Sequence, residues 1–595
     1  MRPAPARRCA PAMSIAAPSG PGRATLHFRP AAALRQAFAR GYGRSDLRAD
    51  LLSGAVVGVV ALPLSMALAI ATGVPPQHGL YTAIVAGGLI ALLGGSKVQV
   101  SGPTAAFVVI LAPIVVRFGL GGLLLATILA GALQAAMGLA RLGRLIQLIP
   151  YPVTIGFTAG IAVVIATLQL RDFLGLEVAA LPEHYLERVG ALARALPTAH
   201  WEEFAVGATT LAVLNLWPRL VTRRVPSPLV ALALAALVVW LLERLFPGFD
   251  VITIRDRFSY ATATGTGQGI PQLPPQPLLP WALPGPGGAP LGLSLSVLRD
   301  LLGPAFAIAM LGAIESLLSA VVADGMTGDN HDPDAELLAQ GVGNLLAPFL
   351  GGIAATGAIA RTATNVRSGA RSPISAIVHA LVVLAAVLVL APALGYLPMA
   401  SLAALLLLVA WNMSEVRHVW IALRTSPRSD SLVLLTCFGL TVVFDMVIAV
   451  GVGLVLASLL FLRRMIEISA VKLVQETHPI TSEPLPPWLL YYEIAGPLFF
   501  GAAHRAMSAL HQSRSGARVV VLDLSAVPVI DATGLVNLRS ALSRLHRDGL
   551  AVVLTGIQPP VREVLERADL REEPGRLRLA ESIQEALQLA RELAG

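Results

Sequence analysis

Two short segments of the chain could bind an anion through backbone N–H groups. Residues 101–106 read SGPTAA and residues 356–361 read TGAIAR. Each opens an apolar run that is too short to cross a bilayer core of about 30 Å as a regular helix, so we expect half-helices. Helix N-termini expose unpaired N–H groups at a positive end, and two such ends facing one another suit an anion. The residues expected to offer donors are Gly102, Thr104, Ala105, Gly357, Ala358, Ile359 and Ala360.

The alternative is that glycine and proline only kink packed helices at these places. The two halves of the chain, however, echo each other. Asp50 precedes Ser65 by the same spacing by which Asp300 precedes Glu315, and the two half-helix segments follow in the same order. The paired occurrence favours a binding site and predicts two repeats of about seven spans each. Because that number is odd, the second repeat must be inverted relative to the first.

Glu315 is the residue most suited to carry a coupling ion. It lies in the interior of an otherwise apolar span, where a carboxylate is costly unless it has a function. Ser319 follows one helical turn later on the same face, so the two could jointly hold a proton or a cation. The alternative is a structural carboxylate tied to a neighbouring helix.

Arg361 follows the second half-helix start by about one turn and supplies a fixed positive charge. It could attract the substrate or balance Glu315. The acidic segment 324–334 departs from the EF-hand spacing and is interpreted as a solvated loop. Cys9 and Cys437 have no partner at a metal-ligand spacing, and we expect no metal and no cofactor. No nucleophile elbow or phosphate-binding loop occurs, so the sequence predicts neither an enzyme nor an ATP-driven pump.

The elements that would position these residues are membrane spans. Hydrophobic residues make up 55% of the chain, charged residues only 13%, and the mean hydropathy is +0.71. A net charge of +8 could suggest nucleic acid as a partner, but the arginines are scattered at span edges, which is typical of membrane topology. We count about fourteen apolar runs. They lie near 51–72, 80–95, 104–116, 120–140, 152–170, 203–216, 226–246, 304–323, 337–350, 357–369, 373–392, 400–412, 430–444 and 446–462.

These runs divide the chain into three parts. Residues 1–45 are predicted to be a disordered cytoplasmic tail, 46–465 a transmembrane domain, and 485–595 a soluble α/β domain with strands near 489–494 and 519–524. Residues 249–290, rich in Pro and Gly, are interpreted as an extracytoplasmic loop. An even number of spans places both termini on one side, and the arginines flanking the first and last spans predict that this side is the cytoplasm.

Two motifs resemble a known family. Residues 75–82, PPQHGLYT, resemble the signature of the sulfate-permease (SulP) family that follows the first span. Residues 519–525 (VVVLDLS) and 529–535 (VIDATGL) are similar to the core of a STAS domain, the fold shared with anti-sigma-factor antagonists. The resemblance implies a fourteen-span inverted repeat of core and gate domains, with substrate between the third and tenth spans and an elevator-like movement. It also implies a homodimer in the cell (inner) membrane that carries sulfate, bicarbonate, chloride or dicarboxylates.

The resemblance also bears on coupling and regulation. Sodium-using members place an Asp and a Thr one turn apart in the eighth span, whereas Glu315 and Ser319 stand here, and the glutamate resembles proton-coupled members. Proton symport is therefore expected; a sodium-coupled bicarbonate carrier, a passive anion channel and a membrane anion sensor acting through the STAS domain are the alternatives. Thr533 matches a hydroxyl that is phosphorylated in the antagonists; the alternative is that Thr533 simply caps the helix after Asp531. The partner of the STAS domain is unknown.

Overall fold

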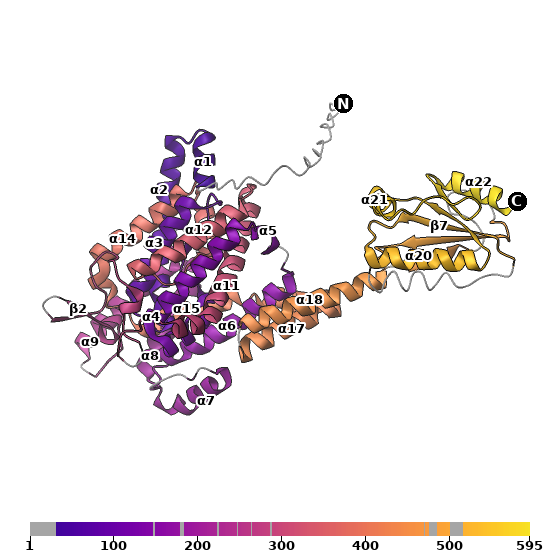
Figure 1. Ribbon diagram of the computed structural model, residues 1–595. Coiled ribbons are helices and arrows are strands. Elements are labelled where there is room, and N and C mark those ends of the chain that lie inside the picture. Colours follow the sequence, from indigo (N-terminus) through magenta and orange to yellow (C-terminus); the bar gives the residue numbers. More distant parts are fainter. Residues whose placement is uncertain are drawn as a thin grey trace, which may run out of the picture. The chain divides into compact units, whose positions relative to one another are not determined.

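The chain forms two compact units, each described here by itself. The computed structural model describes residues 31–595 apart from 147–148, 179–181, 183, 223–224, 247, 263–264, 286–287, 445, 469, 475–484 and 500–515. One unit comprises the described residues up to 425 together with 434–450, and it is helical. The other comprises 426–433 and 451–595 and contains a five-stranded sheet (Figure 1).

The helical unit is assembled from long apolar helices. Nine helices of the described chain are long and apolar enough to cross a membrane. This confirms a helical membrane domain, while the exact number of spans stays a prediction. The helices used below are α1 (Ala32–Ala39), α2 (Arg44–Thr72), α3 (Pro76–Leu93), α4 (Ala105–Leu139), α6 (Tyr151–Phe173), α8 (Trp201–Leu220), α9 (Ser227–Leu245), α11 (Leu295–Thr327), α12 (Pro333–Leu346), α13 (Ile359–Arg367), α14 (Ile374–Leu394) and α15 (Met399–Met413). Three further helices, α16 (Val416–Thr425), α17 (Arg428–Val443) and α18 (Met446–Ile468), follow.

Two predicted half-helices are present. Helix α4 breaks at Gly119, whose φ of 70° lies in the left-handed region, so its first arm ends there. Helix α13 has only 9 residues. Each is preceded by a two-residue strand, β1 (Ser101–Gly102) and β4 (Thr356–Gly357), and these strands pair antiparallel. Antiparallel pairing of corresponding segments is what an inverted repeat requires.

The predicted disordered tail is wrong for residues 32–39, which form α1. Its Ala33 is buried, and the amides of Ala31 and Ala33 donate to the carbonyls of Leu93 at 2.9 Å and Gly94 at 3.2 Å. The segment consists of strong helix formers and can bury a small apolar face, which its Pro-rich and Arg-rich surroundings concealed. Residues 1–30 of the predicted tail lie outside the described residues.

The second unit contains an α/β domain with one antiparallel edge strand. Its sheet runs β5 (Ala470–Val474), β6 (Leu489–Ala495), β7 (Val519–Ala526), β8 (Ala551–Thr555) and β9 (Leu577–Ala580), with β5 antiparallel and the others parallel. Successive residues of β6 enter different cores: Tyr492 packs with α20 (Ala532–Arg547) and α21 (Pro559–Arg567), and Tyr491 with α22 (Ile583–Ala594). The two predicted strands are confirmed. The predicted start at 485 is too late, because β5 belongs to the sheet.

Close helix packing around the half-helices depends on glycine. A Cβ on Gly341 of α12 would lie 2.3 Å from the backbone nitrogen of Ala135 in α4. A Cβ on Gly131 of α4 would lie 2.5 Å from the nitrogen of Leu345. The two helices therefore touch backbone to backbone, and α12 is held directly against the helix that begins at the candidate site.

We expect Gly341→Ala to destabilise the protein, because the added methyl group would force α4 and α12 apart. Overpacking of this kind costs roughly 1–3 kcal/mol. Thermal unfolding in detergent should show a lowered midpoint. Gly303→Ala in α11, where nothing lies within 4 Å of the new Cβ, is the matched control and should leave the midpoint unchanged or slightly raised. Equal midpoints for both variants would contradict this account of the packing.

Candidate functional site

The β1–β4 pair brings the two predicted anion-binding segments together. Ser101 lies opposite Gly357, and Gly102 lies opposite Thr356. The amide of Ala358 also donates to the Val100 carbonyl at 2.9 Å. Because α4 begins three residues after β1 and α13 begins two residues after β4, their N-termini lie at the same short ribbon.

Neither half-helix has a capping side chain. The N-cap residues are Thr104 for α4 and Ala358 for α13, and neither of these two side chains accepts a hydrogen bond from its own helix. Alanine cannot cap, and the Thr104 hydroxyl donates instead to Oε2 of Glu315 at 2.8 Å. The first N–H groups of both helices are therefore left for another acceptor. The Ala358 amide, predicted to be a donor for the anion, is instead bonded to the Val100 carbonyl, because it extends the pairing between the two strands. For Gly102, Thr104, Ala105, Gly357, Ile359 and Ala360, anion binding stays a prediction.

Arg361 joins the two halves of the site. Its side chain is only 2% exposed, and its Nη2 donates to the carbonyl of Pro103, the residue before the α4 cap. Its Nε and Nη1 have no hydrogen-bond partner among the residues that the structure describes. A Cβ on Gly102 would come within 2.6 Å of Nη1, so glycine is needed there for the guanidinium to fit. Arg361 thus makes no hydrogen bond to Glu315, and the guanidinium keeps two nitrogens that can donate to an anion.

Glu315 and Ser319, which the sequence predicts to hold the coupling ion together, bond to different partners. Glu315 pairs with Thr104, as described above. The Ser319 hydroxyl is fully buried and donates to the Thr362 hydroxyl at 3.1 Å, which in turn accepts from the Val100 amide at 3.1 Å. Ser319 therefore supports the start of α13, and Glu315 contacts the start of α4. The direct link between Glu315 and Thr104 was not anticipated from the sequence.

Sequence reasoning also missed a buried polar layer behind the ribbon. It includes Gln99, two residues before β1, and a stripe on α12 formed by Glu336, Gln340 and Asn344, all fully or almost fully buried. Their spacing of four residues within a helix was a usable signal, because a polar stripe on a buried helix must have partners.

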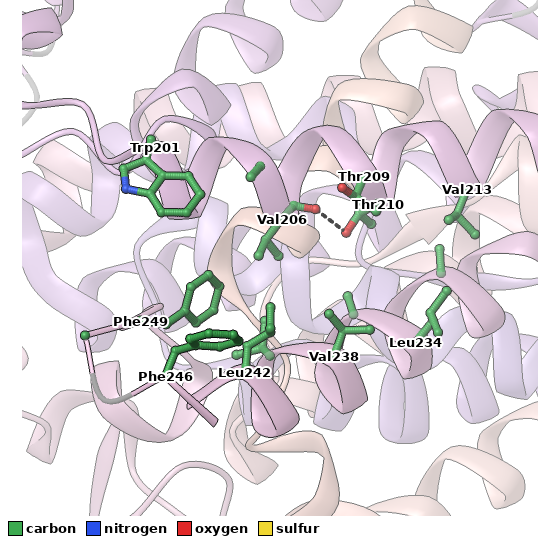
Figure 2. A pocket seen from close by; sticks show the side chains of 15 residues that line it. Trp201, Val206, Thr209, Thr210, Val213, Leu234, Val238, Leu242, Phe246 and Phe249 are labelled. Carbon is green, nitrogen blue, oxygen red and sulfur yellow. Dashed lines mark hydrogen bonds between the residues drawn. The ribbon is translucent and has the colours of Figure 1, made fainter. Parts of the chain in front are cut away.

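A large cavity elsewhere does not fit an anion. It has a volume of about 670 Å³ and lies between α8 and α9 (Figure 2). None of the described residues that line it is charged, and the Thr210 hydroxyl already bonds to the Val206 carbonyl at 2.7 Å and to Ser401 at 2.9 Å. Such a lining suits hydrocarbon. The candidate site therefore stays at the half-helices.

In the α/β domain, Asp531 is the cap of α20. Its carboxylate accepts from the Gly534 amide at 2.7 Å, while Thr533 is exposed in the first turn and does not cap. Phosphorylation of Thr533 stays a prediction.

In the sheet, the Tyr491 hydroxyl donates to Asp523 at 2.8 Å. Burial raises the pKa of Tyr491 far above its usual range, and this hydrogen bond raises it further. The tyrosine therefore remains a hydrogen-bond donor at neutral pH.

The match to known families agrees with this geometry. Residues 47–437 match the Sulfate permease family, and residues 481–586 match the STAS domain. The chain belongs to the sulfate permease family. As a member of this family of transporters it is a multi-pass membrane transporter and not an enzyme, and the resemblance predicted from residues 75–82 and 519–535 is confirmed.

Relatives extend over almost the whole chain. The putative sulfate transporter YvdB of Bacillus subtilis (strain 168) is 40% identical over 536 residues, covering 89% of this chain and 95% of the relative. The bicarbonate transporter BicA of Picosynechococcus sp. is 28% identical over 545 residues, covering 88% and 91%. The solved transmembrane domain of a cyanobacterial BicA, 28% identical, superposes with a TM-score of 0.57 over 69% of this chain and 97% of that one. The overall structure of SLC26A9, 17% identical, has a TM-score of 0.80 with coverage of 94% and 92%, which shows a shared fold.

We expect Arg361→Gln to weaken anion binding about tenfold to a hundredfold, since a hydrogen bond to a charged group contributes about 1.5–3 kcal/mol. Dissociation constants from anion-dependent shifts in thermal unfolding would measure the change. Arg361→Lys keeps the charge but loses the planar fork and should fall between wild type and Arg361→Gln. Arg367→Gln, at the exposed end of the same helix, is the control. Unchanged affinity in Arg361→Gln would remove the guanidinium from the site.

Proposed function

We propose that the chain is a secondary active transporter that carries a small oxyanion, such as sulfate or bicarbonate, or a dicarboxylate, in symport with protons. The observation that carries the proposal is the meeting of two uncapped helix N-termini beside a buried guanidinium with two unpaired nitrogens. Backbone N–H groups and guanidinium N–H groups both bind oxyanions. The transporters of sulfate and of bicarbonate among the relatives support this class of substrate.

Charge accounting supports coupling through Glu315. With Glu315 ionised, its charge offsets that of Arg361, and an entering anion would meet a carboxylate near the start of α4. A proton on Glu315 leaves Arg361 as the uncompensated charge, so proton and anion favour each other's binding. The Thr104 hydroxyl connects proton binding with anion binding, because Thr104 is the N-cap residue of α4 and its hydroxyl donates to Glu315.

The proposal extends to movement, assembly and topology. We infer an elevator-like displacement of a core domain that carries both half-helices against a gate domain, in a homodimer. The arginines before the first span, Arg35, Arg40, Arg44 and Arg48, and those after the last, Arg463 and Arg464, support cytoplasmic termini in the cell (inner) membrane.

The first test is uptake of labelled sulfate, bicarbonate and fumarate into proteoliposomes under a proton gradient and, separately, a sodium gradient. Accumulation of one anion driven only by protons is expected. Accumulation driven only by sodium would instead support a sodium-coupled carrier, and flux without accumulation would support a passive channel.

Glu315→Gln should abolish proton-driven accumulation while sparing exchange of internal for external anion, because glutamine keeps the hydrogen bond from Thr104 but cannot cycle a proton. Exchange in the same vesicles is the control for folding and for the anion site. A variant that still concentrates the anion like wild type would exclude Glu315 as the coupling residue.

Removal of the residues after about 480 should leave transport activity in the membrane domain. The half-helices, Glu315 and Arg361 all lie before residue 425 and make their bonds within the helical unit. Uptake by the truncated chain, normalised to the amount of folded protein, would measure this. Complete loss of uptake from a correctly folded truncated protein would favour a sensor whose two domains act only together.

A further inference from the structure

Helix α12 contacts the segments that lead into both half-helices through one buried polar stripe. Glu336, Gln340 and Asn344 follow one another at intervals of four residues and therefore lie on one face of the helix. Their exposed fractions are 1%, 0% and 0%. We call these three residues the α12 stripe. Buried polar groups of this kind require partners, and the partners are specific.

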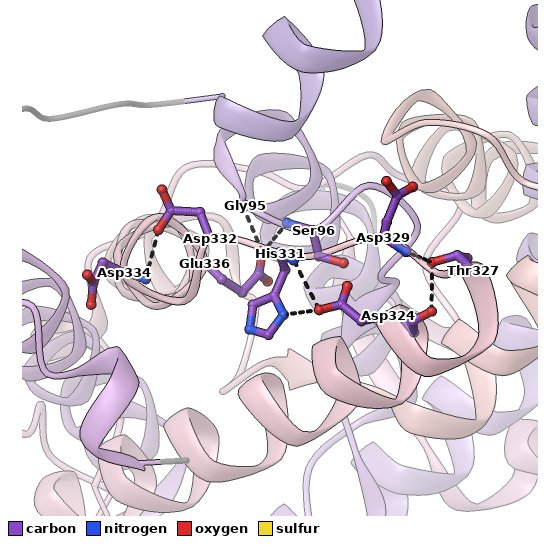
Figure 3. Close-up of polar contacts among 10 residues, drawn as sticks. Gly95, Ser96, Asp324, Thr327, Asp329, His331, Asp332, Asp334 and Glu336 are labelled. Atoms are coloured by element: carbon purple, nitrogen blue, oxygen red, sulfur yellow. Dashed lines mark hydrogen bonds and ion pairs between the residues drawn. The ribbon is translucent and has the colours of Figure 1, made fainter. Parts of the chain in front are cut away.

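The first residue of the α12 stripe holds the segment that leads into α4. Oε2 of Glu336 accepts from the Gly95 amide at 2.9 Å and from the Ser96 amide at 3.1 Å (Figure 3). Its Oε1 accepts from Nε2 of Gln99 at 3.0 Å. All three partners are donors, so both oxygens must act as acceptors. An ionised carboxylate meets this requirement and an amide does not.

The last residue of the stripe holds the segment that leads into α13. Oδ1 of Asn344 accepts from the Ala355 amide at 2.8 Å, and its Nδ2 donates to the Ala355 carbonyl at 2.9 Å. Gln340 donates to the same carbonyl. Since β4 begins at the next residue, Asn344 fixes the backbone just before the second half-helix.

Gln99 links the stripe to the site itself. Its Nε2 donates to Ser316, the neighbour of Glu315, at 2.9 Å, and a Cβ on Gly357 would lie 2.1 Å from this atom. The amide of Gln99 therefore packs against the backbone of β4 while Glu336 holds it from the other side. Helix α12 thus bonds to the segments that precede both strands of the ribbon, and its Gln340 accepts at 3.4 Å from Ser316 of the helix that carries Glu315.

We infer that α12 sets the separation of the two half-helix N-termini, and that Glu336 and Asn344 are positioning residues that determine which size of anion the site accepts. The inference rests on the proposed anion site. Glu336 and Asn344 make their bonds to segments that precede the binding groups, so they act through backbone position and not by touching the anion.

The test is the Glu336→Gln variant of the full-length chain in proteoliposomes. Glutamine has the same shape, but its Nε2 is a donor and would face at least one of the three donors from which the carboxylate accepts. The lost hydrogen bond loosens the segment before α4. We expect the KM for the preferred anion to rise about tenfold, with Vmax within about twofold, and the ratio of kcat/KM between sulfate and fumarate to change by about tenfold. Glu203→Gln is the matched control: this carboxylate is also buried, at 3% exposed, but accepts from Ile252 outside the stripe at 2.8 Å.

Equal changes in KM and in the sulfate-to-fumarate ratio for Glu336→Gln and Glu203→Gln would overturn the inference. A lowered unfolding midpoint in Glu336→Gln, with an unchanged KM and an unchanged ratio, would also overturn it. Asn344→Ser provides a second variant, should Glu336→Gln not fold.

Hydrogen–deuterium exchange separates this inference from the proposed function, because it needs no transport. Glu336→Gln should speed exchange at residues 95–96 and Asn344→Ser at residue 355, and unchanged exchange would overturn the positioning role. Wild-type vesicles that accumulate no anion would contradict the proposed function alone.

Discussion

The helical domain is organised around two helix N-termini whose first N–H groups have no capping side chain. In a low-dielectric interior, unpaired backbone donors are costly, and they persist only where a ligand or water can meet them. The chain places both at one two-strand ribbon and adds the guanidinium of Arg361, which is itself only partly hydrogen-bonded. The free donors therefore form a single positive region.

The surrounding structure stabilises this arrangement by pairing many of the polar groups just behind it, although Oε1 of Gln99 and Oγ of Ser101 are buried without a partner among the described residues. Ser319 and Thr362 tie α11 to the start of α13, and Glu336 and Asn344 tie α12 to the segments before both half-helices. A buried carboxylate with three donors is tolerated because its hydrogen bonds replace those of water. Among these polar groups, those paired by the protein hold the backbone, whereas the free donors of Arg361 lie at the candidate site.

The two carboxylates of the site region illustrate this division. Glu336 accepts three hydrogen bonds, and a proton on it would break at least one of them. Glu315 accepts one hydrogen bond, from Thr104, which leaves its other oxygen without a hydrogen-bond partner among the described residues. The same side-chain type is therefore held at both oxygens in one place and at only one oxygen in the other.

Composition and local pattern alone determined the membrane domain, the α/β domain, the half-helices and the positions of Glu315 and Arg361. Each of these depends on hydrophobic runs, on breaks by Gly and Pro, or on a charge that is out of place in an apolar run, and these are local properties. Tertiary structure alone decided the partners: Thr104 for Glu315, Thr362 for Ser319, and the α12 stripe for residues 95–99 and 355. It also decided that Ala32–Ala39 is a helix and that residues 470–474 join the sheet. Those outcomes depend on contacts between residues far apart in the chain, whose geometry no local pattern encodes.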